Sequence, residues 1–156
     1  MNPTKSVLVI GLGNDILADD AVGLIVAREL EDELSDLADV EYTPEHGVVL
    51  LDYFIGYEKA VIVDAIVTGE NPPGTLIEID PKDLLATAVP SPHYTGIPEL
   101  FMISQQLGLE FPHDVRIIAM EIADPLTVGG EMTREVTEAI PAFKKRVIEI
   151  VNDMTS

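Results

Sequence analysis

The sequence predicts an α/β protein, a three-layer α/β/α sandwich in which helices cover both faces of one mostly parallel, twisted sheet of about five strands. Apolar, β-branched runs alternate along the chain with amphipathic helical stretches. This alternation is typical of parallel sheets, whose strands are buried on both faces and therefore apolar throughout. The 156 residues match the size of one domain, and we expect a single domain over residues 1–156.

The first half of the chain is expected to contain three strands and two helices. Val22, Val26 and Leu30 share one face of a long helical stretch, whereas charged residues lie mostly on the other face. The apolar segment that begins at Gly47 is short enough for a helix of about two turns. The expected strands are residues 6–10, 40–43 and 60–63, the last ending at Asp64, and the expected helices are residues 20–34 and 48–55.

The second half is expected to add two strands and two helices. Thr133 is suited to cap the last helix, and Pro141 should kink or divide that helix because proline cannot donate the backbone hydrogen bond. The expected strands are residues 75–79 and 115–120, and the expected helices are residues 98–107 and 133–152. Residues 68–73, 81–92 and 124–130 read as turns and loops, with one helical turn allowed at 82–86.

Composition excludes several classes of function. The chain has no cysteine, which rules out disulfides, a thiolate nucleophile and a cysteine-based metal site. The net charge of −19, from 28 acidic and 9 basic residues, repels phosphate backbones, so we expect no nucleic-acid partner. Solubility is the simpler explanation of this charge, and steering toward a basic partner is the alternative.

The sequence also bears on location and assembly. The start of the chain lacks the pattern of a signal peptide, and no stretch reaches the ~20 apolar residues that a membrane-spanning helix requires. We therefore expect a cytoplasmic protein without a membrane partner. A monomer is the simplest expectation.

Polar residues follow the expected strands, where ligands collect in open α/β sheets. Asn14 and the pair Asp19 and Asp20 follow the first strand, Asp64 follows the third, and His93 lies in the loop before the helix at 98–107. At Asp19 and Asp20, helix capping is the favoured interpretation, but one aspartate suffices for a cap. At Asp64, a charge next to a buried strand favours function, because an unpaired buried charge is costly.

Taken together, two carboxylates and an imidazole could form a metal site with open positions, suited to a divalent ion of intermediate hardness. Other sites are less well supported. The third glycine of a dinucleotide fingerprint would fall at Ile16, and no Walker lysine or G-x-S-x-G nucleophile motif is present. His46 and His113 read as ordinary solvated histidines.

Several segments resemble the [NiFe]-hydrogenase maturation endopeptidases. VIGLGN (residues 9–14) followed by DDAVG (19–23) is similar to the N-terminal signature of that family. VIVDA (61–65), PGT (73–75), and His93 followed by GIPEL (96–100) are further family-like segments in the same order. The resemblance implies a five-stranded sheet and removal of the C-terminal extension from a nickel-loaded hydrogenase large-subunit precursor.

The resemblance also implies the roles of particular residues. The metal-binding triad of the family carries over to Asp20, Asp64 and His93, and the backbone of Gly47 to substrate binding. The nickel would be supplied by the substrate, with zinc or another divalent ion in the isolated protein as an open alternative. Asp19 and Asn14 are both candidates to orient a water molecule or a ligand, and the sequence does not choose between them.

Two other functions compete with this one. A non-cleaving chaperone that binds the large subunit or nickel could use the same triad. A peptidyl-tRNA hydrolase also begins with a strand leading into a G-x-x-N segment, but it needs a basic face for tRNA, which the charge of −19 opposes.

Overall fold

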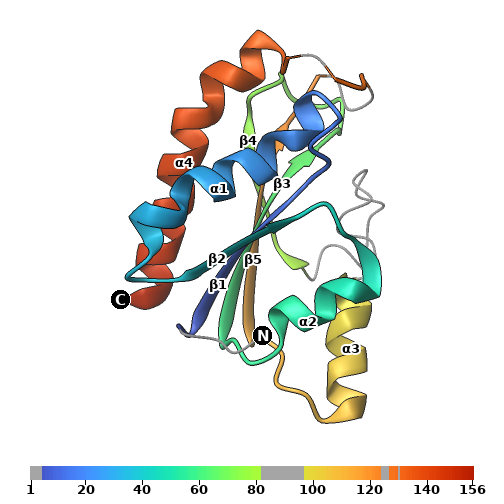
Figure 1. Ribbon diagram of the computed structural model, residues 1–156, viewed down its shortest axis with the longest axis vertical. Coiled ribbons are helices and arrows are strands. Elements are labelled where there is room, and N and C mark those ends of the chain that lie inside the picture. The colour runs from blue at the N-terminus through green and yellow to red at the C-terminus, as the bar shows by residue number, and fades with distance from the viewer. Residues whose placement is uncertain (1–4, 82–96, 124–126, 130) are drawn as a thin grey trace.

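A five-stranded sheet with the strand order β2-β1-β3-β5-β4 forms the centre of the computed structural model, which describes residues 5–81, 97–123, 127–129 and 131–156 (Figure 1). The strands are β1 (Val7–Leu12), β2 (Asp39–Thr43), β3 (Lys59–Ile66), β4 (Leu76–Ile79) and β5 (Asp114–Glu121). The helices are the 3₁₀ turns η1 (Asp19–Ala21) and η2 (Gly47–Leu50), with α1 (Val22–Leu34), α2 (Leu51–Phe54), α3 (Ile97–Leu107) and α4 (Arg134–Thr155).

The pairing of the strands confirms a mostly parallel sheet. β1 pairs in parallel with β2 and β3, β3 pairs in parallel with β5, and β4 is antiparallel, at the edge next to β5. One expectation is wrong in detail: β3 does not end at Asp64 but continues to Ile66, and Asp64 pairs with Ala119. The hydrogen bonds to β5 carry the strand past the point where its apolar run stops.

Two hydrophobic cores, one on each face of the sheet, confirm the predicted three layers. Val61 and Val63 of β3 belong to the core beneath α1 and α4, whereas Ile62 and Ile66 belong to the core beneath α2 and α3. Successive side chains of a strand point to opposite faces, so this division follows from the strand geometry. Figure 1 shows α1 and α4 together on one side of the strands and α2 and α3 on the other.

The last helix differs from expectation at two points. Thr133 occupies its N-cap position, but the threonine side chain makes no capping hydrogen bond. Pro141 does not divide α4, which runs as one helix of 22 residues. The helical turn allowed at residues 82–86 lies outside the described residues. Within the part of the chain that the structure describes, no helix combines the length and the apolar character needed to cross a membrane.

Glycines allow α1 to lie directly on the strands. A Cβ on Gly23 would overlap the carbonyl oxygen of Leu12 and would lie 2.6 Å from the carbonyl oxygen of Val63 and 2.9 Å from the Cα of Asp64. A Cβ on Gly11 would overlap the carbonyl oxygen of Gly23 in return. Only glycine permits so close an approach of two backbones. The first turn of α1 is therefore held against the ends of β1 and β3.

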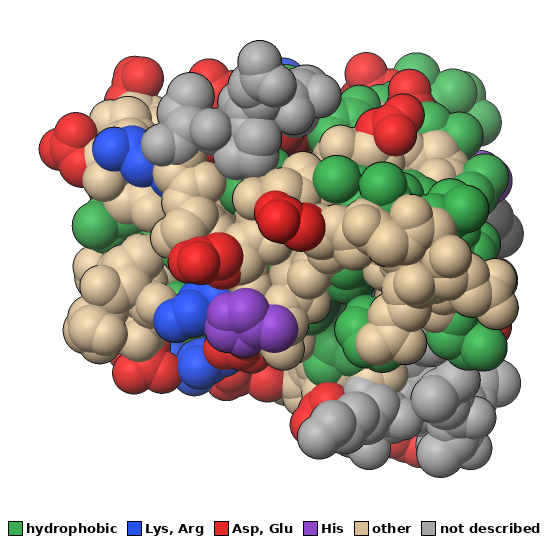
Figure 2. Space-filling model, turned by 90° about the horizontal axis from the view of Figure 1, so that it is seen from below, with side chains coloured by type: hydrophobic (Ala, Val, Ile, Leu, Met, Phe, Trp, Pro, Cys, Tyr) green, Lys and Arg blue, Asp and Glu red, His purple; other side chains and the backbone are tan. Residues whose placement is uncertain are grey.

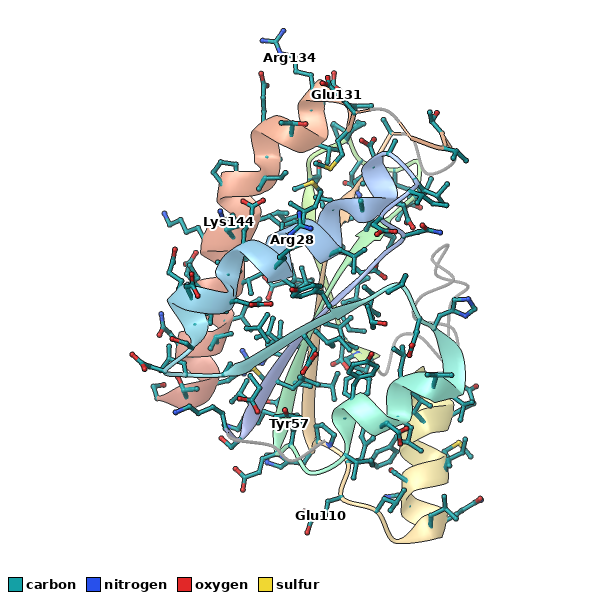
Figure 3. All side chains as sticks on the ribbon, viewed as in Figure 1. Arg28, Tyr57, Glu110, Glu131, Arg134 and Lys144 are labelled. Carbon is teal, nitrogen blue, oxygen red and sulfur yellow. The ribbon has the colours of Figure 1, made fainter. Side chains whose placement is uncertain are left out.

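Tyr57 predicts how stability depends on alkaline pH. Figure 3 places it at the end of the molecule where the parallel strands begin, and its hydroxyl donates to Oδ2 of Asp39 at 2.7 Å. Burial, followed by this hydrogen bond, raises the pKa of Tyr57 above its ordinary value. A raised pKa means that the stabilisation is complete below pH ~10, the pKa of an unfolded tyrosine, and is lost as the pH rises further.

We therefore expect the free energy of unfolding of the wild type to fall more steeply between pH ~10 and ~12 than that of Tyr57→Phe, which has no proton to lose. Urea titrations of both proteins at several pH values would measure the difference. Parallel curves for the two proteins would show that Tyr57 does not couple ionisation to folding.

Candidate active site

The candidate site lies at the carboxyl ends of β1 and β3, where the topology of the sheet changes direction. The connection that leaves β1 enters α1 on one face of the sheet, whereas the connection that leaves β3 leads through β4 to α3 on the opposite face. Such a switch point between neighbouring parallel strands opens a crevice, and ligands of open α/β sheets bind there. Asp20 belongs to the first connection, and Asp64 lies near the end of β3.

Asp20 is half-buried in η1, which packs directly against β3. Its main chain lies against Gly13, because a Cβ on that glycine would overlap the carbonyl oxygen of Asp20. Gly23, one helical turn after Asp20, contacts the Cα of Asp64. Gly13 and Gly23 thus allow the segments that carry the two predicted carboxylate ligands to pack closely together.

Asp64 is completely buried. By the alternation of β3, its side chain points to the face where α2 and α3 pack, as do Ile62 and Ile66. Its Oδ1 accepts a hydrogen bond from the backbone N–H of Ala65 at 2.7 Å. β1 pairs with β3 only as far as Gly11 with Val63, so Asp64 lies at the level where β1 ends and the crevice begins.

Two further predicted residues lie on loops at this same edge. Oδ1 of Asn14 accepts a hydrogen bond from the N–H of Ile16 at 3.1 Å, which shapes the turn after β1. Gly47 begins η2 after β2, with a positive φ of 76°, and among the described residues beyond its chain neighbours no atom lies within 4 Å of a Cβ built on it. Gly47 is half-buried, and its predicted role in substrate binding stays a prediction.

Asp19 differs from the interpretation as a helix cap. The N-cap position of η1 is Ala18, without a side-chain capping bond, and the Asp19 carboxylate is completely buried. Oδ1 accepts from the backbone N–H of Thr133 at 2.7 Å, and Oδ2 accepts from the Thr133 hydroxyl at 2.9 Å and from the N–H of Ala123 at 3.1 Å. Asp19 therefore connects the loop after β1 to the start of α4, near Glu131 and Arg134 in Figure 3.

Glu121, and the pairing of Thr133 with Asp19, were not predicted from the sequence. Glu121 is buried at the end of β5, and its carboxylate accepts hydrogen bonds from the hydroxyl and the N–H of Thr68 and from the N–H of Gly69. It thereby fixes the loop that follows β3. An acid directly after an apolar strand was available as a signal for Glu121, as it was for Asp64, but no sequence signal identifies Thr133 as a partner of Asp19.

The third predicted ligand, His93, lies outside the described residues, so its position relative to Asp20 and Asp64 stays a prediction. Within the described ranges, no group of three or more histidine, cysteine or acidic side chains is arranged to hold a metal ion. Asp20 and Asp64 supply carboxylate oxygens, which suit a divalent cation. A third donor would have to come from His93 or from a bound substrate. His46 and His113 are both exposed, as expected of solvated histidines.

Among the described residues, hollows lie at different ends of the molecule. A pocket of about 520 Å³ is lined by Asp15, Ala21, Leu24, Ile25, Arg28, Tyr42 and Pro44; Ala21 follows Asp20 in the sequence, but neither Asp20 nor Asp64 lines the pocket. A larger groove of about 780 Å³ includes Phe101, Met102, Phe111 and Arg116, and it lies where β5 begins, away from Asp20 and Asp64. Figure 2 views the molecule from that opposite end and shows hydrophobic side chains gathered on its right, the side of α2 and α3. Of the two, the smaller pocket lies nearer to Asp20, since Ala21 lines it.

Comparison with known proteins identifies the family. The model of the hydrogenase maturation protease family (HycI) matches residues 45–150. The hydrogenase 2 maturation protease of Escherichia coli is 30% identical over 118 residues, which cover 73% of this chain and 71% of that protein. The hydrogenase expression/formation protein HupD of Rhizobium leguminosarum is 28% identical over 155 residues, covering 96% and 75%.

The fold agrees with these sequence matches. The hydrogenase maturating endopeptidase HybD of E. coli superimposes with a TM-score of 0.79 over 99% of this chain and 94% of its own, at 26% identity. The chain belongs to the hydrogenase maturation protease family. It is therefore a peptidase, and neither a non-cleaving binding module nor a peptidyl-tRNA hydrolase is favoured.

Proposed function

We propose that this peptidase removes the C-terminal extension of a [NiFe]-hydrogenase large-subunit precursor after nickel has been inserted, and that Asp20, Asp64 and His93 contact the nickel of the substrate. The observation that carries the proposal is the close packing at the switch point between β1 and β3, where ligands of open α/β sheets bind. There, glycine contacts bring the segment of Asp20 against the strand that carries Asp64.

The two carboxylates have complementary environments. Asp64 is fully buried on the most central part of the sheet, where its position is set by strand pairing on the β5 side. Asp20 is half-buried on the 3₁₀ turn η1, so part of it is open to solvent. A buried carboxylate and a more accessible one form an incomplete donor set, which the substrate groups that already hold the nickel ion would complete. His93 would add nitrogen ligation.

Nickel held in this way would supply Lewis-acid chemistry, either by polarising the scissile carbonyl or by lowering the pKa of a bound water. No cysteine is present to act as a nucleophile, and the sequence has no serine nucleophile motif. The role of the protein would then be to orient the peptide bond next to the metal. The half-buried Gly47, after β2, would then contribute its backbone to holding the peptide.

The test compares purified nickel-loaded precursor with the same precursor purified without nickel. We expect cleavage only of the nickel-loaded form, measured by mass spectrometry of the precursor and of the released peptide. A nickel-free precursor reloaded with nickel should regain cleavage, which controls for damage during purification. Equal processing of both forms would refute the dependence on nickel while leaving the protease assignment intact. No processing of either form would refute the proposed client.

A further inference from the structure

Asp19, the neighbour of the candidate ligand Asp20, is a buried carboxylate whose hydrogen-bond partners lie outside its own helix, η1. Its carboxylate accepts from the N–H and the hydroxyl of Thr133 and from the N–H of Ala123. These partners are 104 and 114 residues away along the chain. Burying a carboxylate is costly, and hydrogen bonds of this kind offset that cost.

Further bonds fasten the same two loops together. The N–H of Ala18 donates to the carbonyl oxygen of Thr127 at 3.0 Å, and the N–H of Gly129 donates to the carbonyl oxygen of Ile16 at 2.7 Å. Leu17 and Val128 form an isolated antiparallel bridge between these two bonds. The residues that directly precede Asp20 are therefore paired with the segment between β5 and α4.

On its other side, the main chain of Asp20 lies against Gly13, so tightly that a Cβ there would overlap the Asp20 carbonyl oxygen. Asp20 is thus held from two directions, by backbone packing on Gly13 and by the anchor at Asp19. Only a carboxylate suits this anchor. It offers two accepting oxygens to the donors of Thr133 and Ala123, whereas an asparagine would turn one N–H₂ group toward them.

We propose that Asp19 is a positioning residue, which sets the place of Asp20 in the crevice by fastening the loop after β1 to the start of α4. The proposal rests on the function proposed above, in which Asp20 contacts the nickel of the substrate. Asp19 itself is completely buried, so its role in this proposal is to position Asp20 and not to contact the substrate. The bonds to Thr133 and Ala123 attach this turn to the segment between β5 and α4, so that the turn is held in place relative to the sheet.

The experiment removes one hydroxyl from each of two similar anchors. Thr133→Val deletes the hydroxyl that reaches Asp19 and keeps the size of the side chain. Thr68→Val is the matched control, since its hydroxyl also reaches a buried carboxylate, that of Glu121, but on the loop after β3. Thr133→Ser restores the hydroxyl, and Thr133→Ala replaces the valine variant should the latter fail to fold.

We expect both valine variants to lower the urea midpoint of unfolding to a similar extent. Only Thr133→Val should displace Asp20 in a crystal structure and lower kcat for the nickel-loaded precursor by about tenfold, with KM changed less than about twofold. A large protein substrate makes most of its contacts elsewhere, so its KM should respond little. Thr133→Ser should restore both the position of Asp20 and kcat.

Two results would overturn the proposal: Asp20 unmoved with kcat within twofold of wild type in Thr133→Val, or an equal loss of kcat in Thr68→Val. The crystal structures separate this proposal from the function on which it rests. Wild-type protein that leaves the nickel-loaded precursor uncut would refute the proposed function, whereas the position of Asp20 in the two variants would still decide the role of Asp19.

Discussion

Asp64→Asn is expected to slow cleavage of a nickel-loaded precursor by about 100-fold or more, since replacing even an outer partner of a metal ligand costs about 10–100-fold. The substitution keeps the size of the side chain and one oxygen that can accept the N–H of Ala65. It removes the negative charge that a divalent cation requires. Because Asp64 is completely buried, an acid on the solvent-exposed surface cannot take its place.

The matched control for this loss is Glu121→Gln. Glu121 is also buried, lies on the adjacent strand β5 and faces the same side of the sheet, since its partner Ile66 shares the face of Asp64. Its oxygens, however, hold the loop at Thr68 and Gly69. Glu121→Gln should therefore lower the urea midpoint while keeping cleavage within a fewfold of wild type. If Asp64→Asn cut at the wild-type rate, Asp64 would have no part in the chemistry.

Gly23→Ala is expected to lower the free energy of unfolding by about 3 kcal/mol, at the upper end of the usual cost of overpacking. The added methyl would meet three backbone atoms, of Leu12, Val63 and Asp64, and backbone cannot move aside as a flexible side chain can. Alanine would favour the helix by about 1 kcal/mol, so the clash must exceed that gain. Urea denaturation of the two proteins measures the net effect.

Gly69→Ala separates this clash from ordinary backbone strain. Gly69 has a positive φ of 73°, and a Cβ built on it has no atom of another described residue within 4 Å, its chain neighbours aside. Alanine there should cost about 1–2 kcal/mol through its backbone conformation alone. A smaller loss for Gly23→Ala than for Gly69→Ala would mean that α1 can lift away from the strands without penalty, and that the glycine contact does not hold Asp20 near Asp64.

The extent to which sequence predicted this protein can be judged from individual residues. The apolar strand at residues 60–63 was predicted from its β-branched run, but its extension through Asp64 to Ile66 depends on pairing with β5. Pro141 was expected to disturb the last helix, yet α4 remains one element because its apolar face, including Phe143 and Val147, packs into the core. Tertiary packing overrode local preference at both positions.

The candidate site shows the same limit to what the local sequence predicts. Asp20 and Asp64 were predicted from their places after strands and from family-like motifs, and the structure brings their segments together. At the pair Asp19 and Asp20, helix capping was the favoured interpretation, but the Asp19 carboxylate bonds to Thr133 and Ala123 instead. Thr133 is 114 residues from Asp19, so the local sequence around Asp19 does not indicate that the two are partners. This hydrogen bond depends on which loops the fold places side by side.

By itself, the sequence determined the α/β class, the order of the elements, the exclusion of cysteine chemistry and the residues that resemble the protease family. These properties follow from hydrophobic periodicity, composition and motif spacing, all of which can be read from the linear sequence. Only the tertiary structure decided that β4 is antiparallel, that Gly23 lies on the backbone of β3 and that Asp19 ties η1 to α4. Those features depend on contacts between segments that are distant in the sequence. Such contacts contribute to the free energy of folding only once the sheet has formed.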